Sequence, residues 1–278
     1  MTRRRVAKFV RFLLHLHYDI QTDGGELLRD GKVHLVLPNH PAYIEPPMLC
    51  AEFWDVMLRP MSDEAFFRKP LTRWALHLAN AIMVPDLPAT TAEHRQQSAA
   101  KARALTATAL QTLANGEDLL FYPSGHIRYS PVESIGNRRL AYEVCQGLFA
   151  PENTNRYKDV RVIMLRTSGL DDSLTSKQRT RPVLRRHVRM HFEDMTDRLR
   201  EWCTLDRRAF NEHLEQWYTA TEYCSIFKPH LTKSTFSNKK TCFFLRTYLK
   251  LKYFLYLCIP FIHHLIELVL CKTTQSHC

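Results

Sequence analysis

A histidine and a glutamate stand five positions apart in the segment LPNHPAYIEPP, residues 37–47. If Pro41 starts a helix, His40 caps that helix and Glu45 lies a little over one turn further along. A glutamate there can reach one imidazole nitrogen, fix the tautomer and leave the other nitrogen free to take a proton from a hydroxyl. The pair could act as a general base and its orienting partner, although this spacing is also common in loops without chemistry.

A second polar segment, FYPSGHIRYS, covers residues 121–130. Gly125 on a tight turn permits close approach of a ligand, and Arg128 could pair with a phosphate. Ser124 is not expected to be a nucleophile, because YPSGH lacks the G-x-S-x-G pattern of hydrolases. His126 beside it is expected to line the ligand site rather than react.

Short apolar runs alternate with helical patterns along the chain. Strands are expected at residues 32–38, 56–61, 81–84, 118–122, 160–165 and 187–192, and helices at residues 90–114, 138–148 and 207–218. Gly116 is expected to end the first of these helices. The alternation predicts an α/β domain. Because ligands gather at the carboxyl ends of strands in open sheets, the two polar segments could face one cleft.

Three segments, in this order and spacing, resemble the glycerolipid acyltransferases typified by 1-acylglycerol-3-phosphate acyltransferase. They are NHPAYIE (39–45), FYPSG (121–125) and VRVIML (160–165), which are similar to the family's NHxxxxD motif, its FPEGTRS-like block and its V-P-V-like strand. The stretches LRPMSDEAFF, AIMVPDL, IGNRRLAYEV and MLRTSGLDDS are more narrowly similar to acyltransferase modules fused to acyl-CoA or acyl-carrier-protein synthetases. The resemblance covers residues 32–218 and implies a central mixed sheet flanked by helices.

The resemblance also implies a reaction and its residues. His40 would act as general base on the hydroxyl of a lysophosphatidate-like lysophospholipid, with Glu45 holding the imidazole. The acyl donor would be acyl-CoA or acyl carrier protein, with no metal, further cofactor or covalent intermediate. A synthetase partner that activates the acyl chain is a further expectation. Arg128, or Arg138 and Arg139, would hold the acceptor phosphate, and the other expected substrate-binding residues are Asn39, Ser124, Gly125 and His126.

Two residues depart from the family pattern. Glu45 stands where the family has aspartate, so the carboxylate is one methylene longer and its reach to His40 changes. Ser124 stands where glutamate is usual, and Ile127 displaces the arginine of the block to Arg128. These departures leave two alternatives open: a catalytically impaired membrane- or protein-binding module on the same fold, and an acyl thioesterase that uses water as acceptor.

Residues 1–20 form a basic amphipathic pattern rather than a signal peptide, because Arg11, His15 and His17 interrupt the apolar stretch and no A-x-A site follows. Such a helix could lie on an anionic membrane surface, and it could equally dock on the domain core. With this helix, the chain is expected to be a peripheral membrane protein of the cytoplasmic face.

The last part of the chain, residues 223–278, differs in composition. It has eight Lys or Arg against one acid, Glu267, so its net charge is +7 of the total +11. No alanine follows Ala220, no glycine follows Gly169, and the cysteines show no paired spacing that would predict a zinc site or a disulfide framework. The domain is therefore expected to span residues 1–222, and the tail to be disordered, membrane-associated or aberrant. No motif indicates nucleic-acid binding.

Overall fold

A computed structural model describes residues 3–85, 92–129, 132–171, 173, 175–177 and 185–219. The chain divides into two compact units, Met1–Thr221 and Glu222–Cys278. All of the described residues belong to the first unit. The expected C-terminal tail lies outside them.

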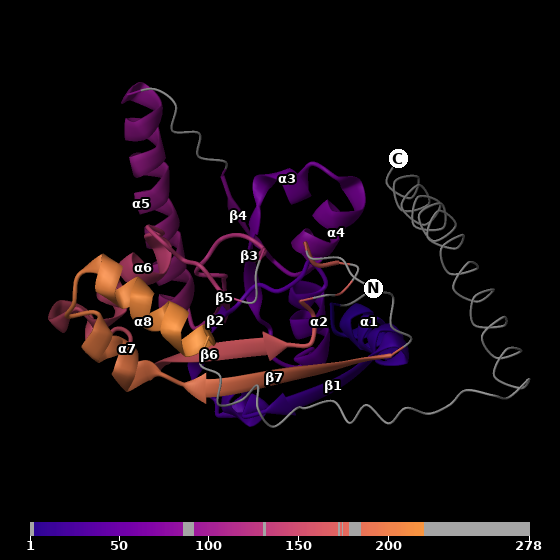
Figure 1. Ribbon diagram of the computed structural model, residues 1–278. Coiled ribbons are helices and arrows are strands. Elements are labelled where there is room, and N and C mark those ends of the chain that lie inside the picture. Colours follow the sequence, from indigo (N-terminus) through magenta and orange to yellow (C-terminus); the bar gives the residue numbers. More distant parts are fainter. Residues whose placement is uncertain are drawn as a thin grey trace, which may run out of the picture. The chain divides into compact units, whose positions relative to one another are not determined.

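Seven strands form one sheet in the order β1-β7-β6-β2-β5-β3-β4 (Figure 1). Every neighbouring pair is parallel except β6 and β7, which are antiparallel. The predicted mixed α/β sheet is therefore confirmed. The strands are β1 (Tyr18–Asp23), β2 (Val33–Pro38), β3 (Arg59–Asp63), β4 (Ile82–Val84), β5 (Leu119–Leu120), β6 (Val160–Ser168) and β7 (Arg186–Asp194).

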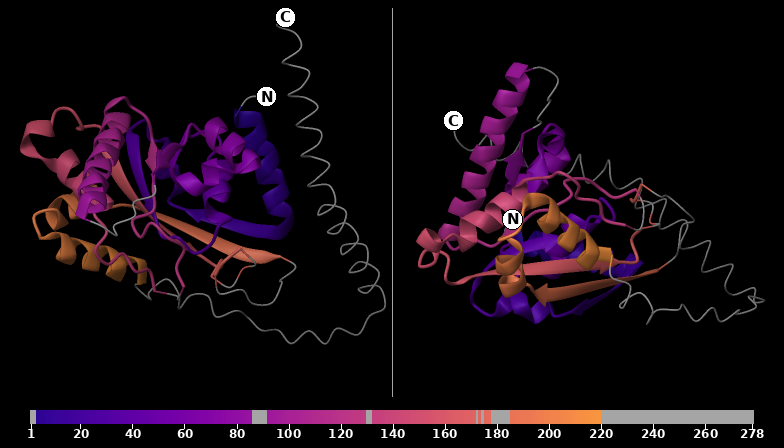
Figure 2. Two further views of the ribbon diagram at one scale, coloured as in Figure 1. Left: turned by 90° about the horizontal axis from the view of Figure 1, so that it is seen from above. Right: turned by 60° about the vertical axis from the view of Figure 1, so that its left-hand side comes forward.

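Both faces of the sheet are covered, because side chains alternate along each buried strand. Leu35 and Leu37 of β2 join one buried cluster, and Val36 between them joins the other. Helices α5 to α8 lie against the first cluster, and α1 and α2 against the second (Figures 1 and 2). The helices are α1 (Arg3–His17), α2 (Glu45–Glu52), α3 (Glu64–Phe67), α4 (Pro70–Leu78), α5 (Ala92–Ala114), α6 (Leu140–Phe149), α7 (Thr196–Trp202) and α8 (Arg207–Thr219), with short 3-10 turns η1 (Gly25–Arg29) and η2 (Pro151–Asn153).

Two predicted elements near the N-terminus need correction. The helix expected over residues 1–20 ends at His17, and Tyr18–Asp23 forms the edge strand β1, which pairs with β7 along its whole length. This segment forms a strand rather than a helix because it pairs with a strand 168 positions away in the chain. A local sequence pattern cannot contain that information. The strand expected at residues 56–61 begins later, at Arg59, and ends at Asp63.

The helix after β2 also begins later than predicted. Residues 41–44 form a turn, and α2 starts at Glu45 with a proline in its first turn. Pro46 is suited to that place, because a helix's first turn needs no donor from it. Pro41 therefore starts no helix, and His40 is not an N-cap.

Helix α1 docks on α2 by one edge. Glu52 of α2 accepts a hydrogen bond from Arg11 at 3.0 Å and contacts Nε2 of His15 at 2.5 Å, and Leu14 is buried. Phe9, Phe12 and Leu16 of the same helix stay about half exposed, at 53%, 62% and 49%. The helix thus packs on the core and also presents an apolar stripe. None of the helices in the described ranges has the length and hydropathy needed to span a bilayer.

Candidate active site

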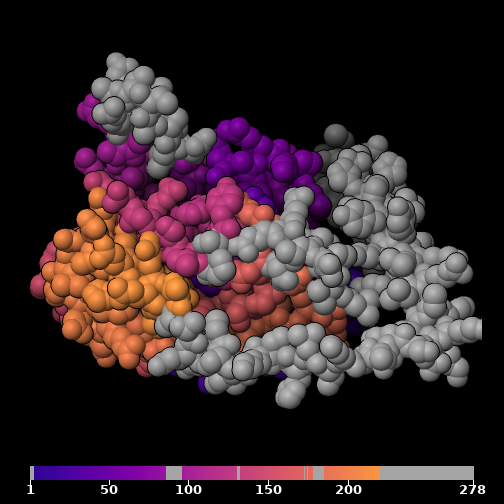
Figure 3. All heavy atoms as spheres, in the orientation of Figure 1, coloured from indigo at the N-terminus to yellow at the C-terminus, as the bar shows by residue number. Residues whose placement is uncertain are grey.

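The carboxyl ends of the parallel strands β5, β2 and β6 bring the two polar segments together. His40 follows β2, and its ring stacks on Tyr122, which follows β5, with the centroids 3.9 Å apart and the planes 24° from parallel. The backbone N–H of Arg128 donates to the carbonyl of His40 at 3.0 Å. The surface of the segment after β5 lies between those of α8 and of the α3–α4 region (Figure 3).

Asn39 anchors the segment that carries His40. Its side-chain amide donates to the Thr167 carbonyl at 3.0 Å, and its oxygen accepts from the Thr167 N–H at 2.7 Å. Asn39 is 1% exposed and Thr167 is fully buried. This reciprocal pair fixes the end of β2 to the end of β6 and so positions the backbone that carries His40. Contact of Asn39 with a substrate stays a prediction.

Glu45 faces His40 from the first residue of α2, where the helix dipole favours a negative charge. Its Oε2 lies 3.6 Å from Nδ1 of His40, and its Oε1 accepts from the Thr167 hydroxyl at 3.0 Å. Complete burial raises the pKa of Glu45, while His40, Tyr122 and Thr167 act in the opposite direction. A gap of 3.6 Å is long for a hydrogen bond, but catalytic contacts often shorten only when substrate binds.

Tyr122 is a residue that the sequence analysis did not select. Its hydroxyl is buried beside Glu45, and the pKa of Tyr122 is raised well above its usual value, first by burial and then by the negative charge of Glu45. No hydrogen bond of normal geometry joins the hydroxyl to a described residue. The tyrosine stood in the quoted block, but only the stacking on His40 indicates its importance.

Glu133 is a second such residue. Its Oε2 accepts from the backbone N–H of His40 at 3.2 Å, and its side chain is 1% exposed. The segment after β5 therefore holds His40 by both backbone groups, through Arg128 on one side and Glu133 on the other. Nothing in the local sequence around Glu133 signals this contact, which joins residues 93 positions apart.

Ser124, Gly125 and His126 form a tight turn. The Ser124 hydroxyl donates to the His126 carbonyl at 3.1 Å, and the Ser124 carbonyl lies 2.8 Å from Nδ1 of His126. Gly125 has a φ of +64°, which L side chains rarely adopt. Ser124 is 1% exposed and its hydroxyl is hydrogen-bonded within the turn, whereas Gly125 is exposed to solvent.

The three candidate phosphate-binding arginines are placed differently. Arg128 is 8% exposed and its Nε donates to Asp171 at 2.6 Å, so a phosphate would have to compete with that carboxylate. Arg138 is exposed, and a methyl group added at Gly125 would lie 4.0 Å from its Nε. Arg139 is exposed and lies 3.9 Å from Glu143 of α6.

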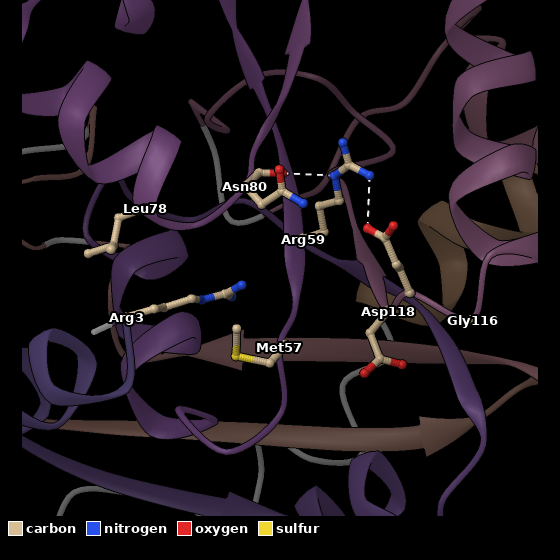
Figure 4. A pocket seen from close by; sticks show the side chains of 8 residues that line it. Arg3, Met57, Arg59, Leu78, Asn80, Gly116 and Asp118 are labelled. Carbon is tan, nitrogen blue, oxygen red and sulfur yellow. Dashed lines mark hydrogen bonds and ion pairs between the residues drawn. The ribbon is translucent and has the colours of Figure 1, made fainter. Parts of the chain in front are cut away.

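A pocket of about 290 Å³ opens elsewhere, at the amino ends of β3 and β5 (Figure 4). Arg59 crosses it to bind Glu117 at 2.8 Å, and Arg3, Asn80 and Asp118 also line it. None of the candidate site residues lines this pocket, so we do not assign the chemistry to it. In the described part of the chain, no group of three or more His, Cys, Asp or Glu side chains could hold a metal ion.

Comparison with known proteins bears on the same region. The crystal structure of the 1-acyl-sn-glycerophosphate (LPA) acyltransferase PlsC from Thermotoga maritima is similar, with a TM-score of 0.47 and 14% sequence identity over 76% of this chain and 79% of PlsC. No curated protein matches. Residues 19–151 match the family model described as Acyltransferase, a range that contains both polar segments. The family of this match is the acyltransferase family that the order of the motifs predicted.

Proposed function

We propose that the chain transfers a fatty acyl group from acyl-CoA or acyl carrier protein to the hydroxyl of a lysophospholipid, with His40 as general base. The observation that carries the proposal is the placement of the His40 imidazole. Tyr122 stacks on the His40 ring, and Nδ1 of His40 faces the buried Glu45 carboxylate. Nε2 is then the ring nitrogen that can take a proton.

In the proposed reaction, His40 carries one proton from the acceptor hydroxyl to the leaving thiolate. Nε2 of His40 takes the proton of the acceptor hydroxyl as its oxygen attacks the thioester carbonyl. The tetrahedral intermediate then collapses, the carbon–sulfur bond breaks, and the imidazolium returns the proton to the leaving thiolate. Glu45 stabilises the imidazolium between these steps. The reaction as proposed uses no metal and no cofactor other than the acyl donor. An acyl-activating synthetase partner would supply that acyl donor.

Arg138 is the better candidate to hold the acceptor phosphate. It is exposed beside the Gly125 turn, whereas Arg128 is already paired with Asp171. Arg138→Ala should raise the KM for a phosphate-bearing acceptor about tenfold, because it removes a charge-assisted contact. A larger rise in KM for Arg128→Ala, in folded protein, would reverse this assignment.

The test of the reaction is a mass-spectrometric transfer assay on purified protein. It offers several lysophospholipids with acyl-CoA and with acyl carrier protein, beside His40→Ala and the control His187→Ala, whose imidazole is 73% exposed on β7. New diacyl lipid that disappears only in His40→Ala is the expected result, and it would identify acceptor and donor together. Free fatty acid alone would favour a thioesterase. No turnover from folded protein would favour an impaired binding module.

We further propose that α1 holds the enzyme on the cytoplasmic surface of a membrane. Its exposed Phe9, Phe12 and Leu16 are accompanied by the exposed Arg4, Arg5 and Lys8, a pairing of apolar and basic side chains that fits anionic lipid. Phe9→Ser/Phe12→Ser should lose flotation with phosphatidylglycerol vesicles, and Leu205→Ser, at another exposed apolar residue, should keep it. Unchanged flotation of the double variant would contradict the proposal.

A further inference from the structure

Four buried polar atoms of His40 and of three residues that interact with it have no hydrogen-bond partner among the described residues. They are Nδ1 of His40, Oε2 of Glu45, the hydroxyl of Tyr122 and Oε1 of Glu133. Buried polar atoms are normally partnered, because an unmade hydrogen bond destabilises the folded protein. Such atoms at one imidazole therefore indicate a network that is assembled for chemistry rather than for stability.

Tyr122 can supply the hydrogen-bond donor that this network lacks. A carboxylate can only accept hydrogen bonds, and the two carboxylates here offer acceptors alone. The Tyr122 hydroxyl can donate, it is buried, and it interacts electrostatically with Glu45 and Glu133. Oε1 of Glu45 is already occupied by Thr167, so Oε2 is the oxygen left for this donor.

The length of Glu45 makes such a donor useful. A glutamate has one more rotatable bond than an aspartate, so its carboxylate is less well fixed by the backbone. Oε2 must be held toward Nδ1, from which it now lies 3.6 Å away. A donor to Oε2 on the same residue that stacks on the imidazole would fix the carboxylate and the imidazole through one rigid side chain.

We propose that Tyr122 is a positioning residue for acyl transfer: its ring holds the His40 imidazole, and its hydroxyl donates to Oε2 of Glu45 and directs that oxygen to Nδ1. The inference rests on the proposed function of His40 as general base. It gives Tyr122 a role that a phenylalanine in the same place could fill only in part.

Tyr122→Phe tests the hydroxyl alone, because it keeps the stacked ring. We expect kcat to fall about tenfold, the value of one hydrogen bond to a charged group, and the KM values to change less than twofold. Tyr142→Phe is the matched control. The Tyr142 hydroxyl, on α6, donates to the Leu205 carbonyl at 3.0 Å, and its removal should leave kcat unchanged. Unchanged kcat in Tyr122→Phe would overturn the proposal.

A double-mutant cycle separates positioning from a general structural role. In a Glu45→Gln background the charged acceptor is gone, so Tyr122→Phe should lower kcat at most about threefold further. Equal losses in both backgrounds would show that the hydroxyl does not act through Glu45.

The same cycle can be measured by urea unfolding without substrate. If the wild-type protein transfers no acyl group, the proposed function fails. The unfolding measurements still test whether Tyr122 and Glu45 are hydrogen-bonded. Non-additive changes in the free energy of unfolding would support the hydrogen bond between Tyr122 and Glu45, and additive changes would overturn it.

Discussion

Two histidines at opposite ends of β2, His34 and His40, have very different surroundings. His34, near the amino end, is 1% exposed and uses both ring nitrogens: Nδ1 contacts Asp118 at 2.9 Å and Nε2 contacts Asp30 at 3.0 Å. His40, just beyond the carboxyl end, keeps 14% exposure and completes no hydrogen bond through Nδ1. A satisfied imidazole stabilises a fold, whereas an unsatisfied one that reaches solvent can accept a proton from a ligand.

The pKa of His34 reflects its two carboxylates. Burial lowers that pKa, but the hydrogen bonds and charges of Asp118 and Asp30 outweigh burial, so the pKa is raised overall. His34 therefore keeps its proton to a higher pH than an ordinary histidine, and it ties β2 to the start of β5 and to the turn before β2. The comparison teaches that burial alone does not identify a catalytic histidine, because the completeness of its partners decides.

The largest expected effect should appear in turnover and only for His40. His40→Ala should lower kcat by about 10² to 10⁴, the usual contribution of a general base. Its free energy of unfolding should change by no more than about 1 kcal/mol, because the ring makes no completed side-chain hydrogen bond. A loss of several kcal/mol measured by urea unfolding would mean that His40, like His34, is structural.

His34→Ala should show the opposite pattern. It leaves Asp118 and Asp30 without their shared partner, so the free energy of unfolding should fall by about 1.5 to 3 kcal/mol, while kcat of the folded enzyme stays unchanged. His187→Ala is the control, because its pair with Asp19 is largely exposed and should contribute well under 1 kcal/mol. A lower kcat in folded His34→Ala would contradict a purely structural role for His34.

A smaller effect is expected on the pH dependence of stability. Because the folded-state pKa of His34 is raised above the unfolded value of about 6.5, its contribution is fully present below that pH and is lost as pH rises through the folded pKa. Urea unfolding from pH 6 to pH 9 should therefore show a decline in stability that His34→Gln lacks. Identical profiles for the two proteins would contradict the raised pKa.

The existence of β2, β5 and β6 could be predicted from local patterns, since these runs are apolar and bounded by turn residues, but their order in the sheet could not. The edge strand β1 did not, because it exists only through its pairing with β7. At the site, His40 and Glu45 could be selected from residue type and spacing. Tyr122 and Glu133 could not, because a stacked ring and a buried carboxylate obtain their importance from His40, 82 and 93 positions away.

The reciprocal pair between Asn39 and Thr167 has a kinetic consequence. It joins residues 128 positions apart, and contacts of such long sequence separation form late, after their loop-closure entropy has been overcome. A ribosome-bound chain that has not yet emerged beyond β5 contains His40 and Glu45 but not the strand that fixes them. Acyl transfer should therefore be among the last properties to return on refolding, after helical circular dichroism has recovered.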